Sequence, residues 1–186
     1  MNTLPAAARR HVDTLLAECR PLHALPGGFY GDPVVHAADV EVFWRRGWVF
    51  AGHACELANP GDYLTLSIDT DPLVIVRGDD GRLRAFHNVC THRGTVLCRE
   101  DRGRVGRIVC PYHQWTFDRD GALVSCRGMP ADLDRTGLDL APVHVEECAG
   151  LVFLCVAAEP PDFGRARELM EPMARPQRLE RARVAA

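Results

Sequence analysis

Apolar positions near the start of the chain recur with the period of a helix. Over residues 4–19 they fall on one helical face, and Pro21 would end that helix because proline lacks the N–H that a helix interior needs. A second helix is predicted over residues 36–46, after the turn signal Asp32-Pro33. The pattern therefore predicts a helical arm over residues 1–47.

From residue 48 to about residue 156 the pattern changes to short runs in which apolar and polar residues alternate, as is typical of strands. Glycine-containing turns at residues 78–81 and 119–121 separate neighbouring runs, as in hairpins. The predicted strands cover residues 48–53, 62–68, 73–77, 82–87, 107–110, 115–118, 123–125, 143–148 and 151–156. Many short strands at this spacing predict a mainly β fold, built as an antiparallel sandwich or small barrel.

A third segment begins after Pro160-Pro161, where the composition becomes rich in Arg and Glu. Residues 163–186 show a helical period that Pro172 and Pro176 would interrupt. The sequence thus predicts three parts: a helical arm over 1–47, a β domain over 48–158, and a helical tail or linker over 159–186.

The composition narrows the class of protein. The 186 residues are 47% hydrophobic and 25% charged with a formal net charge of −3, so no nucleic-acid or acidic-membrane partner is expected. No run of 18 apolar residues occurs, so no membrane-spanning helix is expected. The start lacks the pattern of a secretory signal, and the eight cysteines are spread along the chain. These features favour free thiols and metal ligands in a reducing cytoplasm.

Two short segments combine a thiol with an imidazole at close spacing. Cys90 and His92 lie in the first segment, and Cys110 and His113 lie in the second. Glycine and proline around them allow tight loops whose backbone N–H groups can point at sulfur. Two thiolates can hold one iron of a [2Fe–2S] cluster while two neutral imidazoles hold the other, which makes the cluster easier to reduce than an all-cysteine one. A structural zinc ion accepts the same four ligands and is the alternative.

The pattern Cys-x-His…Cys-x-x-His is that of Rieske proteins, and its flanks resemble one branch of them. Residues 110–117 are similar to the second cluster loop in the large (alpha) subunits of ring-hydroxylating and related Rieske non-heme iron oxygenases, and residues 86–94 and 48–53 are similar to other parts of them. The similarity covers about residues 33–160. It implies a Rieske-type antiparallel β-sandwich with a two-loop cluster-binding subdomain, one Rieske-type [2Fe–2S] cluster and one-electron transfer. The ligands that it implies are Cys90, His92, Cys110 and His113.

The sequence departs from this family in two places. Gln114 stands where the family usually has glycine. The large subunits also continue into a catalytic domain whose mononuclear iron is held by two histidines and a carboxylate, and the 186 residues end where that domain would begin. The resemblance implies electrons from an NAD(P)H-dependent flavin reductase or a ferredoxin. It also implies electron transfer to the catalytic iron domain of an oxygenase, in a trimer.

Residues next to the predicted ligands are expected to shape the surroundings of the cluster. They are Arg93, Gly94, Tyr112, Gln114 and Trp115. Trp115 is expected to pack over the cluster and exclude water, because hydrophobic cover tunes the reduction potential. Arg93 would either orient a partner or solvate its loop. The other cysteines are expected to be small core residues, namely Cys19, Cys55, Cys98, Cys126, Cys148 and Cys155.

Three functions fit the sequence. The first is the electron-receiving part of a Rieske oxygenase large subunit, of the aromatic-ring hydroxylation or amine demethylation type, and the resemblance includes members that act on quaternary amines and betaines. The second is a stand-alone, ferredoxin-like Rieske electron carrier, and the third is a zinc-stabilised Cys2His2 interaction module. The helical arm, which small Rieske ferredoxins lack, favours the first. Without a mononuclear iron site, the chain alone is expected to transfer electrons and not to oxygenate a substrate.

Overall fold

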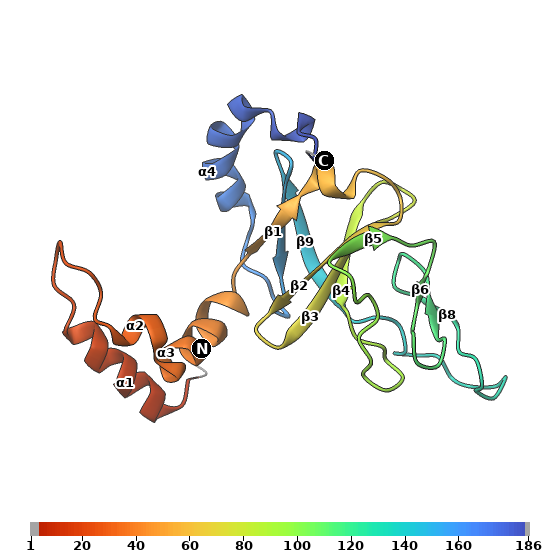
Figure 1. The fold of residues 1–186 in the computed structure, drawn as a ribbon, viewed down its shortest axis with the longest axis horizontal. Helices are drawn as coiled ribbons and strands as arrows, with labels where there is room; N and C mark the ends of the chain where they lie inside the picture. Colours follow the sequence, from red (N-terminus) through yellow and green to blue (C-terminus); the bar gives the residue numbers. More distant parts are fainter. Residues whose placement is uncertain (1–3, 185–186) are drawn as a thin grey trace.

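Short antiparallel strands occupy the centre of the chain, and helices precede and follow them (Figure 1). The computed structural model describes residues 4–184. The strands are β1 (Val49–His53), β2 (Asp62–Ile68), β3 (Asp71–Arg77), β4 (Leu83–His87), β5 (Arg102–Arg104), β6 (Ile108–Val109), β7 (Thr116–Phe117), β8 (Leu123–Ser125), β9 (Pro142–Cys148) and β10 (Leu151–Cys155). The helices are α1 (Ala6–Ala17), α2 (Gly28–Gly31), α3 (Pro33–Asp39) and α4 (Gly164–Ala174), with short 3-10 segments at Ala54–Leu57, Arg175–Gln177 and Leu179–Arg181.

The strands form two sheets. Seven of them pair in the order β1-β10-β9-β4-β3-β2-β5, and the other three form a small sheet in the order β6-β7-β8. Every pairing is antiparallel, and the longest runs from the pair Tyr63 and Val76 to the pair Ile68 and Asp71. The predicted mainly β, antiparallel fold is confirmed. The exposed edge strand β5 was not predicted, because its three residues are all polar or glycine.

Strand β3 separates two hydrophobic cores. Leu73 and Ile75 point into a core that side chains from several strands of the large sheet form on one face, whereas Val74 and Val76 point to the opposite face. The second side packs against the small sheet and the loops around it, including Phe117. Because both faces of β3 are buried, its sequence is an unbroken apolar run and does not alternate. Burying each such side chain contributes about 1.5–3 kcal/mol, so this strand anchors the small sheet to the large one.

A glycine makes the tight turn between β7 and β8 possible. Gly121 has φ +86°, and a Cβ atom there would lie 2.4 Å from the ring of Phe86. The Gly121 carbonyl also accepts a hydrogen bond from the backbone N–H of Leu140, at 2.9 Å. The predicted hairpin turn therefore lies directly against the core that supports the small sheet.

The N-terminal helices project away from the sheets as an arm (Figure 1). Asp32 caps α3 by accepting a hydrogen bond from Val34 N at 2.8 Å, and it also bonds the His11 ring of α1 at 2.7 Å. The hydrogen bond with His11 is the main cause that lowers the pKa of Asp32. The second predicted helix starts earlier than residue 36, because the cap at Asp32 and the proline after it begin a helix at once. It continues as a π-helical turn over Val40–Trp44, and α2 was not predicted.

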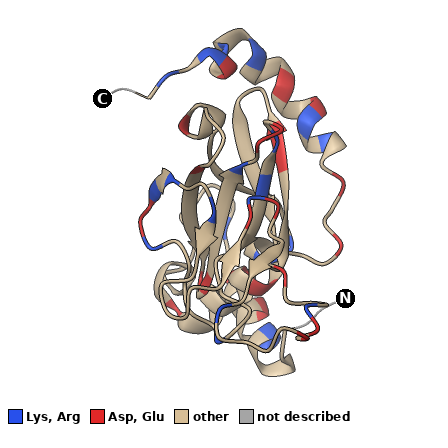
Figure 2. Cartoon of the chain, turned by 90° about the vertical axis from the view of Figure 1, so that its right-hand side faces the viewer, with Lys and Arg blue, Asp and Glu red and all other residues tan. Residues whose placement is uncertain are grey.

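The C-terminal helix α4 packs across the end of the large sheet. Phe163, which precedes it, is buried with its ring 5.0 Å from that of Trp48, and Arg167 forms an ion pair with Glu146 of β9 at 2.7 Å. Residues of both charge signs follow one another along this helix (Figure 2). The predicted interruption at Pro172 is wrong, because α4 runs through this residue. Pro172 is exposed, so the hydrogen bond that its missing N–H cannot make lies at the surface of the helix, where solvent has access.

Candidate metal centre

The predicted ligands lie on two loops with the same backbone hydrogen bonds. In each loop the cysteine carbonyl accepts from the N–H four residues later, and the cysteine N–H donates to the carbonyl five residues later. The four bonds join Gly94 N to Cys90 O (2.9 Å), Gln114 N to Cys110 O (3.0 Å), Cys90 N to Thr95 O (2.8 Å) and Cys110 N to Trp115 O (2.8 Å). The first loop follows β4, and the second joins β6 to β7. Two matched loops thus present one cysteine and one histidine each.

The matched loops need a left-handed residue at the same position. Gly94 has φ +74° in the first loop, and Gln114 has φ +62° in the second. Glycine adopts this conformation without a steric penalty, whereas a residue with a Cβ atom does so at a cost of about 1 kcal/mol. The geometry explains why glycine is the usual residue where this sequence has Gln114.

The two cysteines lie deep in the core, with Cys90 and Cys110 exposed by only 2% and 1%. Burial raises the pKa of the Cys90 thiol, and the adjacent Cys110 thiol raises it further. The backbone N–H groups of His92 and Arg93 donate hydrogen bonds to the Cys90 sulfur and act in the opposite direction. Two neighbouring buried thiols with N–H groups directed at sulfur form a suitable site for one metal ion that holds them as thiolates.

The two histidines lie beside each other with unpaired nitrogens. The ring centroids of His92 and His113 are 4.8 Å apart at an interplanar angle of 72°. The Nδ1 atoms of both rings are buried, and neither has a hydrogen-bond partner among residues 4–184. Leaving such an atom unpaired costs about 1–3 kcal/mol, and a metal ion bound by the two Nδ1 atoms would remove this cost. Burial first, then His113 and the Arg93 charge, lower the pKa of His92 and favour the neutral ring that binds metal.

The four side chains are arranged as two pairs and not around one point. Within residues 4–184, no three His, Cys, Asp or Glu side chains are placed to share a single metal ion. Tetrahedral zinc needs all four donors within about 2.0–2.3 Å of one point. A [2Fe–2S] cluster instead takes its two thiolates on one iron and its two imidazoles on the other. The donor geometry therefore fits the cluster and disfavours the zinc alternative.

Aromatic side chains cover the histidines. Trp115 is 2% exposed and stacks on the His92 ring, with centroids 4.6 Å apart and planes 10° apart. Tyr112 is exposed, and the centroids of its ring and the His113 ring are 3.7 Å apart. The Arg93 guanidinium lies 6.0 Å from the centre of the Tyr112 ring. Trp115 is thus buried against the His92 ring, and its packing over a cluster stays a prediction. Arg93 reaches from the first loop to the second.

Sequence reasoning missed a buried residue that holds the first loop in place. Asn88 is 2% exposed, and its side chain makes two hydrogen bonds with the backbone of Cys98, as donor to O at 2.7 Å and as acceptor from N at 2.9 Å. Its own N–H donates to Pro72 O at 2.8 Å. The available signal was an amide side chain two residues before Cys90, at the end of a predicted strand. Asn88 ties the two ends of the loop to each other and to the start of β3.

The remaining cysteines divide into two groups. Cys98, Cys126, Cys148 and Cys155 are buried, as predicted for small core residues. Cys19 and Cys55 are only half-buried, so for them the prediction of a core position is wrong. Cys19 lies in the exposed arm just beyond α1, and Cys55 lies in the 3-10 turn after β1, where neither can be fully covered.

Burial should make Cys98 unreactive. It raises the pKa of this thiol to about 11, so almost no thiolate forms at pH 8. Because the unfolded thiol ionises near pH 9, stability from this group is intact below pH 9 and falls as the pH rises from 9 to 11, by at most about 3 kcal/mol. We expect iodoacetamide at pH 8 to label Cys19 and Cys55 but not Cys98, as measured by peptide mass spectrometry. Equal labelling of Cys98 and Cys19 would contradict this.

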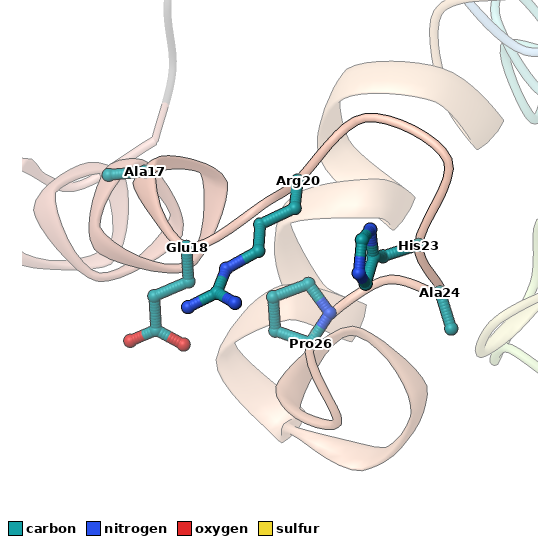
Figure 3. A pocket seen from close by; sticks show the side chains of 6 residues that line it. All are labelled: Ala17, Glu18, Arg20, His23, Ala24 and Pro26. Carbon is teal, nitrogen blue, oxygen red and sulfur yellow. The ribbon is translucent and has the colours of Figure 1, made fainter.

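A pocket in the helical arm lies away from the loops. Figure 3 shows its lining residues, which are Ala17, Glu18, Arg20, His23, Ala24 and Pro26. The arm extends on the opposite side of the large sheet from β6 and β8 (Figure 1). This pocket is therefore not part of the candidate metal centre.

The family model for the Rieske [2Fe-2S] domain matches residues 47–143, which include both loops. The chain therefore belongs to the Rieske [2Fe–2S] domain family, which confirms the predicted family and its Rieske-type cluster. Along 97% of its length it is 38% identical to the glycine betaine monooxygenase oxygenase subunit of Chromohalobacter salexigens. Along 70% of its length it is 40% identical to the carnitine monooxygenase oxygenase subunit of Escherichia coli K12.

Solved structures show the same relationship. The quaternary ammonium Rieske monooxygenase CntA superimposes on 87% of this chain with a TM-score of 0.79 and 32% identity, and 46% of that chain is covered. Naphthalene 1,2-dioxygenase from Rhodococcus gives a TM-score of 0.74 at 28% identity over 87% of this chain and 38% of that one. The chain spans 41% of the Chromohalobacter relative and 35% of the Escherichia relative. None of the helices in residues 4–184 is long and apolar enough to cross a membrane.

Proposed function

We propose that Cys90, His92, Cys110 and His113 hold the [2Fe–2S] cluster and that the chain is the electron-receiving part of a Rieske oxygenase large subunit. The observation that carries the proposal is the pair of buried, unpartnered histidine Nδ1 atoms next to a pair of buried thiols on matched loops. Domain boundaries at residues 48 and 158 belong to the same proposal.

When bound, the cluster accepts and returns one electron at a time, at a potential raised by its two neutral ligands. The residues of the chain create the conditions for this. Cys90 and Cys110 are kept dry, and Trp115 shields the first histidine from water. His92 and His113 are only half-buried, so their outer ring edges form the path for electrons to and from a partner.

The substrate class that we propose for the whole oxygenase is a quaternary ammonium compound such as a betaine. The relatives named for glycine betaine and carnitine support this, and the glycine betaine relative matches the helical arm as well as the Rieske domain. The proposed electron donor is an NAD(P)H-dependent flavin reductase or a ferredoxin. The proposed acceptor is the catalytic iron domain of an oxygenase in a trimer, within the cytoplasm. A match that extends over the arm favours this function over a stand-alone electron carrier.

A polypeptide of these 186 residues should transfer electrons without oxygenating substrate. Within residues 4–184 no three side chains are placed to hold a mononuclear iron, which oxygen activation in this class requires. We expect reversible one-electron reduction by dithionite, followed in the visible spectrum, and no oxygen-dependent product from glycine betaine or carnitine. The intact glycine betaine monooxygenase oxygenase subunit is the positive control. Sustained turnover by the 186 residues alone would refute the assignment.

A further inference from the structure

The two matched loops differ at one position where the backbone demands the same conformation. The left-handed residue is Gly94 in the first loop and Gln114 in the second. The first loop shows that glycine satisfies this geometry. A glutamine at the equivalent place is disfavoured by its Cβ atom, so its presence points to a role for its side chain.

The Gln114 side chain has a specific partner. Its Oε1 atom accepts a hydrogen bond from Nη1 of Arg127, which lies just beyond β8 and the buried Cys126. Arg127 forms no ion pair with a carboxylate among residues 4–184. Its positive charge is therefore fixed next to the second loop by a neutral amide and is not cancelled by an adjacent negative charge.

This charge lies against the loop that supplies two of the proposed ligands. Gln114 directly follows His113, and its backbone N–H bonds Cys110 O, so Arg127 is attached to the loop that supplies one proposed ligand to each iron. Reduction adds one negative charge to the cluster. A cation held nearby favours the state with the extra negative charge. Arg127 and Gln114 are both exposed, so water screens this charge, but the bond to Gln114 keeps it closer to the loop than a freely moving side chain would be.

We propose that Gln114 is a positioning residue that holds the Arg127 guanidinium against the second loop, so that its charge favours reduction of the cluster. This inference rests on the proposed function, since it requires the cluster on these loops. The difference between Gly94 in the first loop and Gln114 in the second then has an electrostatic role, because the left-handed glutamine fixes the position of the Arg127 charge.

The test measures the reduction potential of the cluster-loaded chain by protein-film voltammetry at low ionic strength. At a fixed electrode potential, Arg127→Gln should lower the ratio of reduced to oxidised cluster at least twofold. This corresponds to a reduction potential that is lower by about 18 mV, since 59 mV corresponds to a tenfold change for one electron. Gln114→Gly, which also suits the backbone, should lower the potential in the same direction. The double variant should have the same reduction potential as Arg127→Gln alone, because both changes remove the same electrostatic effect. Arg127→Lys keeps the charge and should lie closer to the wild type than Arg127→Gln.

Arg165→Gln on α4 is the matched control, since it changes the net charge equally at a distance from the loops. The inference is overturned if Arg127→Gln shifts the potential no more than Arg165→Gln. It is also overturned if Gln114→Gly leaves the potential unchanged, or if the two shifts add in the double variant. A wild-type chain without iron, acid-labile sulfide and visible absorption would overturn the proposed function and this inference with it. A loaded cluster with unmoved potentials would overturn this inference alone.

Discussion

Replacing Cys90 or Cys110 by Ser, or His92 or His113 by Ala, should abolish the visible absorption and the Rieske electron-resonance signal. Each replacement removes one of four donors, and the remaining three cannot complete the coordination of both irons. Cluster binding is coupled to the folding of the two loops, so the altered chains should also be less stable than the loaded wild type. Optical and electron-resonance spectra of the purified variants, with iron and sulfide analysis, measure the loss directly.

Cysteines outside the two loops provide the controls for this experiment. Cys98→Ala and Cys126→Ala remove buried thiols from the same core without touching the four proposed donors. Both variants should keep the spectrum of the wild type, although each loses some packing energy. Loss of the cluster in Cys98→Ala together with its retention in Cys90→Ser would show that the ligand assignment is wrong.

Asn88→Ala should destabilise the chain by about 2–5 kcal/mol and reduce the amount of cluster that it retains. The substitution leaves the N–H and the carbonyl of Cys98 buried without partners, and each unpaired group costs about 1–3 kcal/mol. The end of the loop at Cys98 then loses its side-chain attachment to the start of the loop, which should loosen the position of Cys90 between them. Urea unfolding followed by circular dichroism gives the change in the free energy of unfolding, and iron content gives the retention.

Asn59→Ala is the matched control for Asn88→Ala. Asn59 is exposed, and its side chain makes one hydrogen bond, to Asp62 at 3.1 Å. Its replacement should change the free energy of unfolding by at most about 0.5–1 kcal/mol. If both asparagine variants unfold at the same urea concentration, the buried hydrogen bonds of Asn88 do not support the loop.

Local signals in the sequence predicted those parts of the fold that are fixed by neighbouring residues. The β7–β8 hairpin follows from Gly121, and the proposed ligands follow from two motifs whose donors lie two or three residues apart. The strand β5 was missed because pairing with β2, and not its own composition, makes it a strand. Pro172 was misread because packing of α4 against the large sheet holds the helix together, and the proline itself lies on its exposed side.

Contacts between distant residues could not be predicted in this way. The bonds from Asn88 to Cys98 and from Gln114 to Arg127 span ten and thirteen residues, and they form only after the sheets bring these segments together. Asparagine is common in turns, and the residue types of Gln114 and Arg127 likewise specify no distant partner, so none of the three carries a local signal for such a contact. The candidate site was therefore predicted in its donors and not in the residues that hold the donors in place.

The two-sided strand β3 also determines which face of the large sheet receives the metal-binding loops. Its larger side chains, Leu73 and Ile75, fill one core, and its smaller ones, Val74 and Val76, face the other. If β3 paired one residue out of register, these sets would exchange sides, and the bulkier residues would crowd the space under the loops. The difference in volume between neighbouring residues thus favours the native register of β3, because a misaligned strand would overpack the core under the small sheet at a cost of about 1–3 kcal/mol.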